Sequence, residues 1–537
     1  MMEDVTGLRV YWSRLAKETR GIRWRPRSVR WLLLIVFPLG FLISWPAYDQ
    51  WSDYLWLTVI AMVACGLLLT RLGRPLVDTL PLWVILSVFL LGYYLKFYWM
   101  SWALMTGAPF PVPGFERLAQ SPDLRLRVYQ FTTMGFGVFC VAGFAFWRRW
   151  EFGARLLSED ATRLGTSAPI WPRLGTVLLS LLTVVMVGTG YAQYITGVAI
   201  LGRPMVRLPF RLAGVIFYAR TLAVPMLLLL VVWLSMRRRS WVAVVLALLM
   251  LMCHGLSQMV LSSSRGSLID MVIPLVFLPI LESGKARREV VLIIAAVATA
   301  FAVSSLLHPV ISRYRLVRAS GDPRDITGAL SQALESPIEP EEPSEPIRPY
   351  PPSYRPGGRA TLPALVMSYG ARGVQSILAR VVGAEHMLYV VQEPDTPPSQ
   401  DKLRHYLADS DARPLTLVYT HEVMGIPRSQ PTSGAPSLVG AFYLLGGSIG
   451  VCAGVTLWTA LWALVWGLGQ RLNLCTRPVA QSMLLQMLLR WTSEGDIDTI
   501  PLRGSLLLAC VLLCEVLVRA SVWRGSRCGE PTDASPT

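Results

Sequence analysis

The sequence is poor in charged residues: only 16% of its 537 residues are Asp, Glu, Lys or Arg, whereas 53% are hydrophobic. Soluble globular domains carry charges on about a quarter of their residues. The mean hydropathy of +0.47 points in the same direction. This balance excludes an ordinary soluble protein and predicts an integral membrane protein.

The sequence also lacks the short motifs of several enzyme classes. None of its eight cysteines belongs to a C-x-x-C pair, which argues against a zinc site or a disulfide framework. There is no G-x-x-x-x-G-K-[ST] loop and no H-E-x-x-H helix. Nucleotide hydrolysis and zinc proteolysis therefore have no support. No clear repeat relates the two halves of the chain, which disfavours an inverted-repeat transporter.

Long apolar segments are what the sequence has in abundance. A helix needs about 20 mainly apolar residues to cross a hydrocarbon core, and the chain offers many segments of this kind. We therefore predict an all-α polytopic membrane protein with about 12 transmembrane helices, the eleventh being the weakest. The predicted spans lie at residues 31–47, 53–70, 80–105, 128–147, 174–195, 211–235, 241–262, 267–281, 290–307, 436–469, 479–491 and 502–518.

The distribution of basic residues predicts the orientation of these spans. Residues 1–30 form a basic arm without a small-residue cleavage site, so we expect an uncleaved first helix and a cytoplasmic N-terminus. The connections that then fall in the cytoplasm are rich in Arg and Lys, and residues 521–537 form a cytoplasmic tail. This bias and contact with anionic membrane lipids explain the net charge of +16, so we expect no nucleic-acid partner.

One predicted external connection is far longer than the others. It covers residues 308–435 and separates nine spans within residues 31–307 from three within residues 436–520. Its segment 337–356 is rich in proline, which favours an extended conformation and excludes a helix. Residues 363–390 repeat apolar side chains every three or four positions, which predicts an amphipathic helix on the bundle or on the membrane surface.

Arg265 separates two apolar runs in the segment LSSSRGSLID, residues 261–270. The predicted topology puts it in a short external turn, where its charge faces water, a partner or a cavity. An arginine that snorkels from a helix end is one plain alternative. An ion pair with Asp270 is another, although a spacing of five points two side chains of one helix apart.

Further arginines gather on the same predicted side of the membrane. They form two clusters, which consist of Arg203, Arg207 and Arg211, and of Arg313, Arg315 and Arg318. External cations run against the positive-inside bias and therefore suggest a bound anion. Guanidinium groups match phosphate oxygens with two parallel hydrogen bonds. The clusters predict a site for a lipid-linked phosphate, the alternative being a solvated rim that contacts lipid headgroups.

Histidine is the usual base for group transfer near neutral pH, and the chain has only five histidines. His421 is the best candidate because it lies shortly before the chain re-enters the membrane, with Arg428 nearby. His386 is the second candidate. For either one, an exposed or hydrogen-bonded histidine without a role is the alternative. His254, within the seventh predicted span, is expected to be a buried core residue.

Lys96 lies within an apolar span, and aromatic residues surround it in the segment GYYLKFYWMSW. Such a setting is typical of the aromatic belt at a membrane interface. We therefore expect Lys96 to extend its ammonium group to the membrane surface.

The segment SSSRGSLID, the long external connection and the segment PTSGAPSLVGAFYLLGGSIGVCAG together resemble the bacterial O-antigen polymerase family, the oligosaccharide repeat-unit polymerases. Members of this family have many spans, a motif of small residues plus Arg-Gly that opens a span, and one large periplasmic loop. The resemblance covers roughly residues 250–490, and the proline-rich insert departs from it.

The resemblance implies a membrane glycosyltransferase of the GT-C type in the bacterial inner membrane, without a metal or another cofactor. Its substrate would be an oligosaccharide on undecaprenyl pyrophosphate, which it would join to another lipid-linked repeat unit of a surface polysaccharide. A flippase and a chain-length regulator would be its partners. Arg265 would hold the departing pyrophosphate, helped by the two arginine clusters, Arg372 and Arg428, and His421 would be the base.

Three other functions stay open at this point. An O-antigen ligase has the same architecture and chemistry but delivers the glycan to a different acceptor. A glycosyltransferase that uses polyprenyl-phosphate sugars would have an acidic first external loop, for which Asp49 and Asp53 are candidates. A flippase or transporter of lipid-linked saccharide would use the same arginines for binding alone.

Overall fold

The computed structural model describes most of the predicted spans and parts of the connections. Within the described residues all regular structure is helical, which confirms the all-α class. The described residues are 27–72, 76–106, 110, 115–149, 171–198, 200, 209, 212–237, 240–264, 267–281, 287–322, 324–335, 383–392, 415–426, 435–470, 472, 476–495 and 497–527.

Eight helices in the described part of the chain are long and apolar enough to cross a membrane, which supports a membrane-embedded protein. They are Trp51–Thr70, Asp78–Thr106, Pro122–Trp147, Leu178–Thr196, Leu212–Met236, Trp241–Ser262, Val290–Leu307 and Leu438–Gly469. Leu33–Ala47 and Ser267–Leu281 are shorter apolar helices. The last two predicted spans fall on α21 (Arg477–Glu494) and α22 (Ile500–Arg527), which are not among the eight. The total of twelve spans and their sidedness stay predictions.

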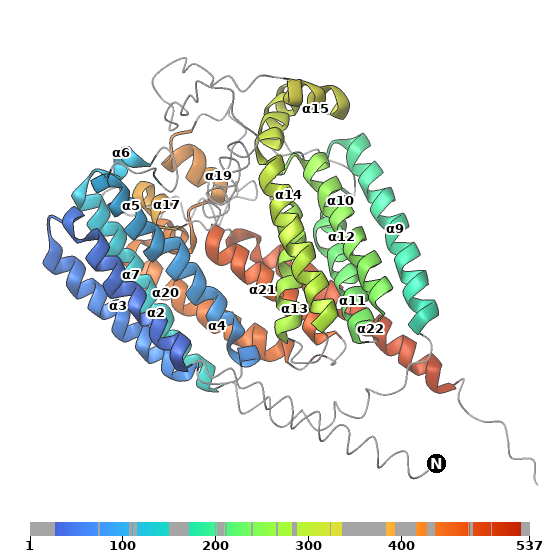
Figure 1. Cartoon of the computed structure of the whole chain (residues 1–537), viewed down its shortest axis with the longest axis horizontal. Coiled ribbons are helices and arrows are strands. Elements are labelled where there is room, and N and C mark those ends of the chain that lie inside the picture. The colour runs from blue at the N-terminus through green and yellow to red at the C-terminus, as the bar shows by residue number, and fades with distance from the viewer. Residues whose placement is uncertain are drawn as a thin grey trace, which may run out of the picture.

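The helices form two bundles, and the first is drawn mainly in blue in Figure 1. It consists of α2 (Arg27–Ser44), α3 (Trp51–Arg71), α4 (Leu76–Val88), α5 (Lys96–Thr106), α6 (Glu116–Ala119), α7 (Pro122–Arg149) and α20 (Leu438–Gly469). α7 lies at its centre, because it packs along α3 on one side and along α20 on the other. α20 bends at Gly447, whose φ of 58° favours glycine.

The second bundle follows in green and yellow in Figure 1. It consists of α9 (Trp171–Thr196), α10 (Leu212–Tyr218), α11 (Val224–Arg237), α12 (Trp241–Ser262), α13 (Ser267–Leu281), α14 (Arg287–Ser320) and α15 (Ile326–Glu335). α12 packs against α9, α11, α13 and α14 and is the centre of this bundle. α14 runs through His308 without a break, so the predicted external connection begins as a continuation of a spanning helix.

α21 joins the two bundles. It packs against α4 and α20 of the first bundle and against α11 and α13 of the second. Arg490 on α21 forms an ion pair with Asp270 on α13 at 3.6 Å, and the Gln486 amide donates to the Asp270 carbonyl oxygen at 2.5 Å. Most side chains of α21, on which the weakly apolar eleventh predicted span falls, are buried against other parts of the protein. Asp270 therefore has a partner on another helix.

Two of the spanning helices contain a π-helical segment. η2 (Phe89–Leu95) joins α4 to α5, and η5 (Ala219–Ala223) joins α10 to α11. A π-helical segment fits one extra residue into a turn and is frequent at functional sites. A cation lies at or beside each segment: Lys96 directly follows η2, and Arg220 lies within η5. These two cations are buried inside the two bundles.

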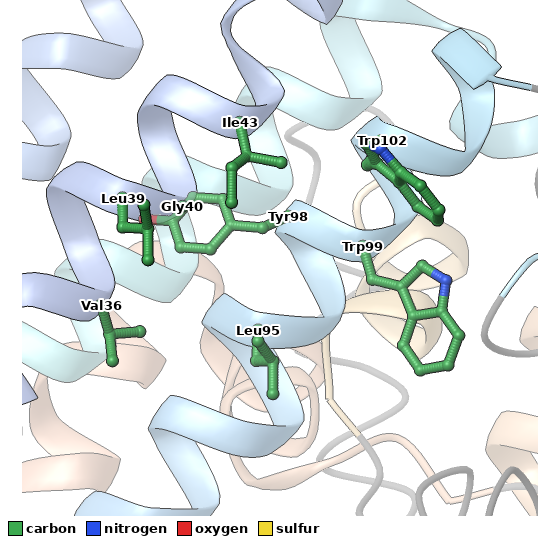
Figure 2. Close-up of a pocket in the computed structure, with 8 residues that line it drawn as sticks. All are labelled: Val36, Leu39, Gly40, Ile43, Leu95, Tyr98, Trp99 and Trp102. Carbon is green, nitrogen blue, oxygen red and sulfur yellow. The ribbon is translucent and has the colours of Figure 1, made fainter.

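An apolar groove with a volume of about 370 Å³ runs between α2 and α5. Figure 2 shows the ring of Tyr98 lying against Gly40, with Trp99 and Trp102 on the same helix as Tyr98. The polar end of Tyr98 is engaged elsewhere, since its hydroxyl group lies 2.9 Å from the Tyr129 hydroxyl group. The groove therefore offers an apolar surface and no group for acid–base chemistry. Its lining consists of Val36, Leu39, Gly40, Ile43, Leu95, Tyr98, Trp99 and Trp102.

Candidate functional site

A short helix from the long connection packs into the first bundle. This helix, α17 (Ala384–Val390), contacts η2, α5, α6, α7 and α20. Figure 1 shows it in the upper part of the molecule, behind the blue helices. Most of its side chains are buried. The end of the predicted amphipathic helix 363–390 thus packs on the bundle, whereas its residues before Gly383 and the proline-rich segment 337–356 lie outside the described residues.

Lys96 forms a buried ion pair with Glu385 of α17, so the prediction that it snorkels is wrong. The two side chains are 3% and 0% exposed. Burial raises the pKa of the Glu385 carboxyl group, and the Lys96 cation opposes that rise. The prediction failed because the partner lies 289 residues away in the sequence. The ion pair ties the long connection to the spanning helix α5.

Gly383 sets how closely α17 approaches η2. A Cβ atom at this position would overlap the carbonyl oxygen of Gly92. Gly383→Ala should therefore push α17 away from the bundle and destabilise the protein by about 1–3 kcal/mol, the usual cost of overpacking. Thermal unfolding of the purified protein measures this loss, with Gly66→Ala as control because a Cβ there meets no atom within 4 Å. Equal melting temperatures for the two variants would contradict the close approach.

His386, the neighbour of Glu385, forms hydrogen bonds that define its tautomer. Its Nδ1 lies 2.9 Å from the Tyr419 hydroxyl oxygen, and that hydroxyl group donates to the His386 carbonyl oxygen at 3.2 Å. Because the hydroxyl group has one hydrogen and the carbonyl oxygen can only accept, Nδ1 must carry the proton. Nε2 then holds a lone pair. Burial, and secondly the Lys96 cation, lower the pKa of His386 to about 3, so its ring is neutral near pH 7.

The lowered pKa of His386 predicts acid sensitivity. The unfolded chain takes up the proton near pH 6.5 and the folded chain only near pH 3. The contribution of His386 to stability is therefore complete above pH 6.5 and is lost as the pH falls towards 3. His386→Asn keeps a hydrogen-bonding nitrogen near the position of Nδ1 and cannot titrate. We expect its melting temperature to fall less than that of the wild type between about pH 7 and about pH 4.

The pH titration compares the variant with the wild type because other ionisable groups face His386. Glu385 acts in the opposite direction: its raised pKa stabilises the fold at low pH, and this contribution is lost as the pH rises through that pKa. Lys96 and Tyr419 also interact with His386 and are ionisable. All three are present in both proteins, so their effects cancel in the difference. Parallel melting profiles would contradict the assignment to His386.

The predicted base His421 lies in the same part of the molecule. It belongs to the π-helical turn η6 (Tyr419–Val423), which follows α19 (Leu415–Val418). The backbone of His421 is thus two residues away from Tyr419, the partner of His386. The side chain of His421 lies outside the described part of the structure, so its role as a base stays a prediction. Both candidate histidines come from the long connection, and the hydrogen bond between His386 and Tyr419 joins α17 to the turn that contains His421.

Arg318 closes the end of α12. Its guanidinium group donates to the carbonyl oxygens of Val260 and Leu261 at 2.8 and 2.6 Å, and its side chain is fully buried. Cations commonly stabilise the free carbonyl groups at a helix C-terminus. Ser263, with φ of 56°, ends the helix two residues before Arg265. Arg318 therefore holds the C-terminal end of α12, which Arg265 follows in the sequence, whereas its predicted contact with substrate stays a prediction.

The other predicted arginines are only partly covered by the structure. Arg313 and Arg315 are half-buried on α14, on the turns that precede Arg318. The remaining ones lie outside the described residues, and their contact with substrate stays a prediction: Arg203, Arg207, Arg211, Arg265, Arg372 and Arg428. No group of three or more His, Cys, Asp or Glu side chains that could hold a metal ion occurs within the described ranges.

Arg220 is the cation that the sequence analysis missed. It is 1% exposed, and its guanidinium group donates to Gln258 and to Ser257 on α12. Nε2 of His254 lies 2.7 Å from the carbonyl oxygen of Arg220. His254 is completely buried, as predicted. The signal was present, because an arginine interrupts the apolar segment GVIFYARTLAVPM.

Comparisons with protein-family models, with curated proteins and with solved structures find no match for this chain. The function must therefore be inferred from the residues of the chain and from the resemblance noted in its sequence.

Proposed function

We propose that the protein is a polymerase that joins lipid-linked oligosaccharide repeat units into a surface polysaccharide. The observation that supports this most directly is the packing of the long connection onto the membrane bundle through Lys96 and Glu385. This contact holds His386, and beside it the turn of His421, against a spanning helix. A lipid-linked sugar presents its reacting atoms at this kind of boundary between membrane and water.

The proposed reaction transfers a glycan from undecaprenyl pyrophosphate to a hydroxyl group of a second lipid-linked unit. His421 takes the proton of the acceptor hydroxyl group while its oxygen forms the new glycosidic bond. The bond between the anomeric carbon and the pyrophosphate breaks, and the electron pair leaves with the pyrophosphate. Arg265 faces the charge that grows there, where preorganised cations contribute most to the rate. No redox partner, nucleotide or metal is needed to balance this step.

Arg318 and His386, whose side chains the structure describes, have supporting roles in the proposed reaction. Because Arg318 fixes the end of α12, it would hold the turn of Arg265 towards the departing pyrophosphate. The neutral ring of His386 has its Nε2 lone pair available, so His386 is the alternative base. A base with a pKa near 3 accepts a proton poorly at pH 7. His421 therefore stays the first choice.

The decisive experiment supplies the purified full-length protein with an undecaprenyl-pyrophosphate-linked repeat unit and resolves the product by length. A ladder of polymers is expected. A single product on a different acceptor would indicate a ligase. Failure to extend the glycan, together with movement of labelled lipid-linked units between leaflets, would indicate a flippase and would refute the proposal.

A further inference from the structure

Among the residues that the structure describes, the second bundle buries a cation that no carboxylate offsets. Arg220 lies in η5, within the apolar span of residues 212–236, and is 1% exposed. Its described partners are neutral oxygens: Gln258 Oε1 at 2.6 Å, Ser257 Oγ at 2.8 Å and the Met186 carbonyl oxygen at 3.3 Å. Among the described residues no acidic group pairs with it. Lys96, a buried cation of the first bundle, pairs with Glu385.

A buried amide with no partner in the described structure lies on the face of α9 that contacts Arg220. Gln193 on α9 is 2% exposed, and neither its nitrogen nor its oxygen has a hydrogen-bond partner in the described structure. Gly190 precedes it by three residues and therefore shares its face of the helix. A Cβ atom at Gly190 would lie 2.6 Å from Nη1 of Arg220. The amide and the guanidinium group thus belong to the same contact between α9 and η5.

The hydrogen-bond capacity of this cluster is only partly used. A guanidinium group has five N–H hydrogens, and the described bonds of Arg220 use three of them. The Gln193 amide adds two more hydrogens. Four N–H hydrogens therefore stay available beside a buried positive charge. Buried charges and buried polar groups are costly unless a partner satisfies them.

His254 fixes the shape of this cluster. Its Nε2 donates to the carbonyl oxygen of Arg220 at 2.7 Å, which supplies a partner where the π-helical segment departs from ordinary helical bonding. The side chain of Arg220 thereby bonds to α12, and His254 of α12 bonds to the main chain of Arg220, so two contacts hold η5 against α12. The donors of the cluster are held in place and do not have to be gathered by a ligand.

We propose that Arg220 and Gln193 form an anion site in the second bundle and that its ligand is a phosphate-type oxyanion. The guanidinium fork matches phosphate oxygens, and one negative charge offsets the charge of Arg220. Ionisable residues inside membrane proteins commonly mark such sites. The site goes beyond the proposed function because it includes neither Arg265 nor the candidate bases His386 and His421. The phosphate group can come from a membrane lipid or from free phosphate.

The test measures binding by the purified full-length protein in lipid nanodiscs. In one arm, the discs contain neutral phosphatidylcholine and inorganic phosphate is titrated while thermal unfolding is followed. In the other arm, no phosphate is added and phosphatidylglycerol replaces part of the neutral lipid. We expect stabilisation in at least one arm. A response to phosphate alone identifies a soluble anion, and a response to phosphatidylglycerol alone identifies a lipid headgroup.

Gln193→Leu is the main variant, because the apolar replacement keeps the size of the side chain and leaves Arg220 in place. It should weaken the binding by roughly tenfold to a hundredfold, the effect of losing a hydrogen bond to a charged group. Arg220→Lys keeps the charge and loses the fork, so it should bind more weakly as well. Gln470→Leu, which removes an amide whose buried nitrogen has no described partner, should bind like the wild type.

The proposal is overturned by either of two results. One is a wild-type protein that neither anion stabilises. The other is a Gln193→Leu variant that responds as the wild type does. Polymerisation of the glycan is not part of this assay, so failure here leaves the proposed function intact and failure there leaves this site intact.

Discussion

His421→Ala is expected to reduce the rate of glycan extension by roughly 10²–10⁴-fold, the usual contribution of a general base. The protein should still insert into the membrane and melt near the wild-type temperature. The measurement is the initial rate of ladder formation from an undecaprenyl-pyrophosphate-linked repeat unit. Arg265→Ala should cause a loss of roughly 10²–10³-fold for a different reason, because it removes a charge that stabilises the departing pyrophosphate.

Two controls separate this chemistry from a general loss of structure. His405→Ala changes another histidine of the same connection and should keep nearly full activity. Arg265→Lys keeps the charge without the planar fork and should recover part of the rate. Full polymerisation by His421→Ala would refute its role as the base. In that case His386→Asn becomes the decisive variant, since His386 is the alternative base in the same contact.

Lys96→Met is expected to cause the largest loss of stability. The replacement leaves the Glu385 carboxyl group buried without its cation, and breaking a buried ion pair in this way costs about 3–5 kcal/mol. The measurement is the thermal or chemical unfolding of the purified protein. α17 should also become accessible to a protease, because the ion pair connects it to α5.

The double variant Lys96→Met with Glu385→Leu tests whether an unpaired charge causes this loss. Replacing both partners by apolar side chains should recover most of the stability. Arg490→Met serves as the matched control, because its ion pair with Asp270 is about one-third exposed. Such exposed pairs contribute about 0–1 kcal/mol. Equal losses for the single and double variants would show that packing, and not charge, determines the effect.

The helices of the apolar segments could be predicted well because an apolar segment is a local property of the sequence. About 20 consecutive apolar residues are sufficient to indicate it, whatever the rest of the chain does. Each predicted span coincides with a helix of the structure, and α14 exceeds its span only because its polar end continues as helix. α21 shows where this argument weakens. A helix covered by protein does not need an apolar surface towards lipid.

The charged contacts could not be predicted because each depends on a partner far along the sequence. The sequence around Lys96 is rich in aromatic residues, which indicates an interfacial position. Nothing in the sequence identifies Glu385 as its partner. The sequence grouped Arg318 with Arg313 and Arg315 and did not indicate that its guanidinium group closes α12. Counting residue types identifies which charges exist. Only the packing of helices decides which of them are held inside.

Arg220 was missed for a different reason. Its span is so apolar that one arginine hardly changes the average hydropathy. Arg220 also lies outside the predicted external connections, where the anion site was expected. Lys96, in a comparable span, was noticed because of its aromatic neighbours. An arginine inside a span is by itself a sign of function, and it needs no cluster to support it.

The π-helical segment before Lys96 makes the whole ion pair depend on the number of residues in one turn. Each residue of an α-helix rotates the chain by about 100° and advances it by about 1.5 Å. Loss of a single residue from η2 would let α4 and α5 join as one regular helix. Every later side chain of α5 would then turn by about this angle, which would direct Lys96 away from Glu385. A one-residue deletion in the membrane would thus detach the long connection without altering any residue of the connection itself.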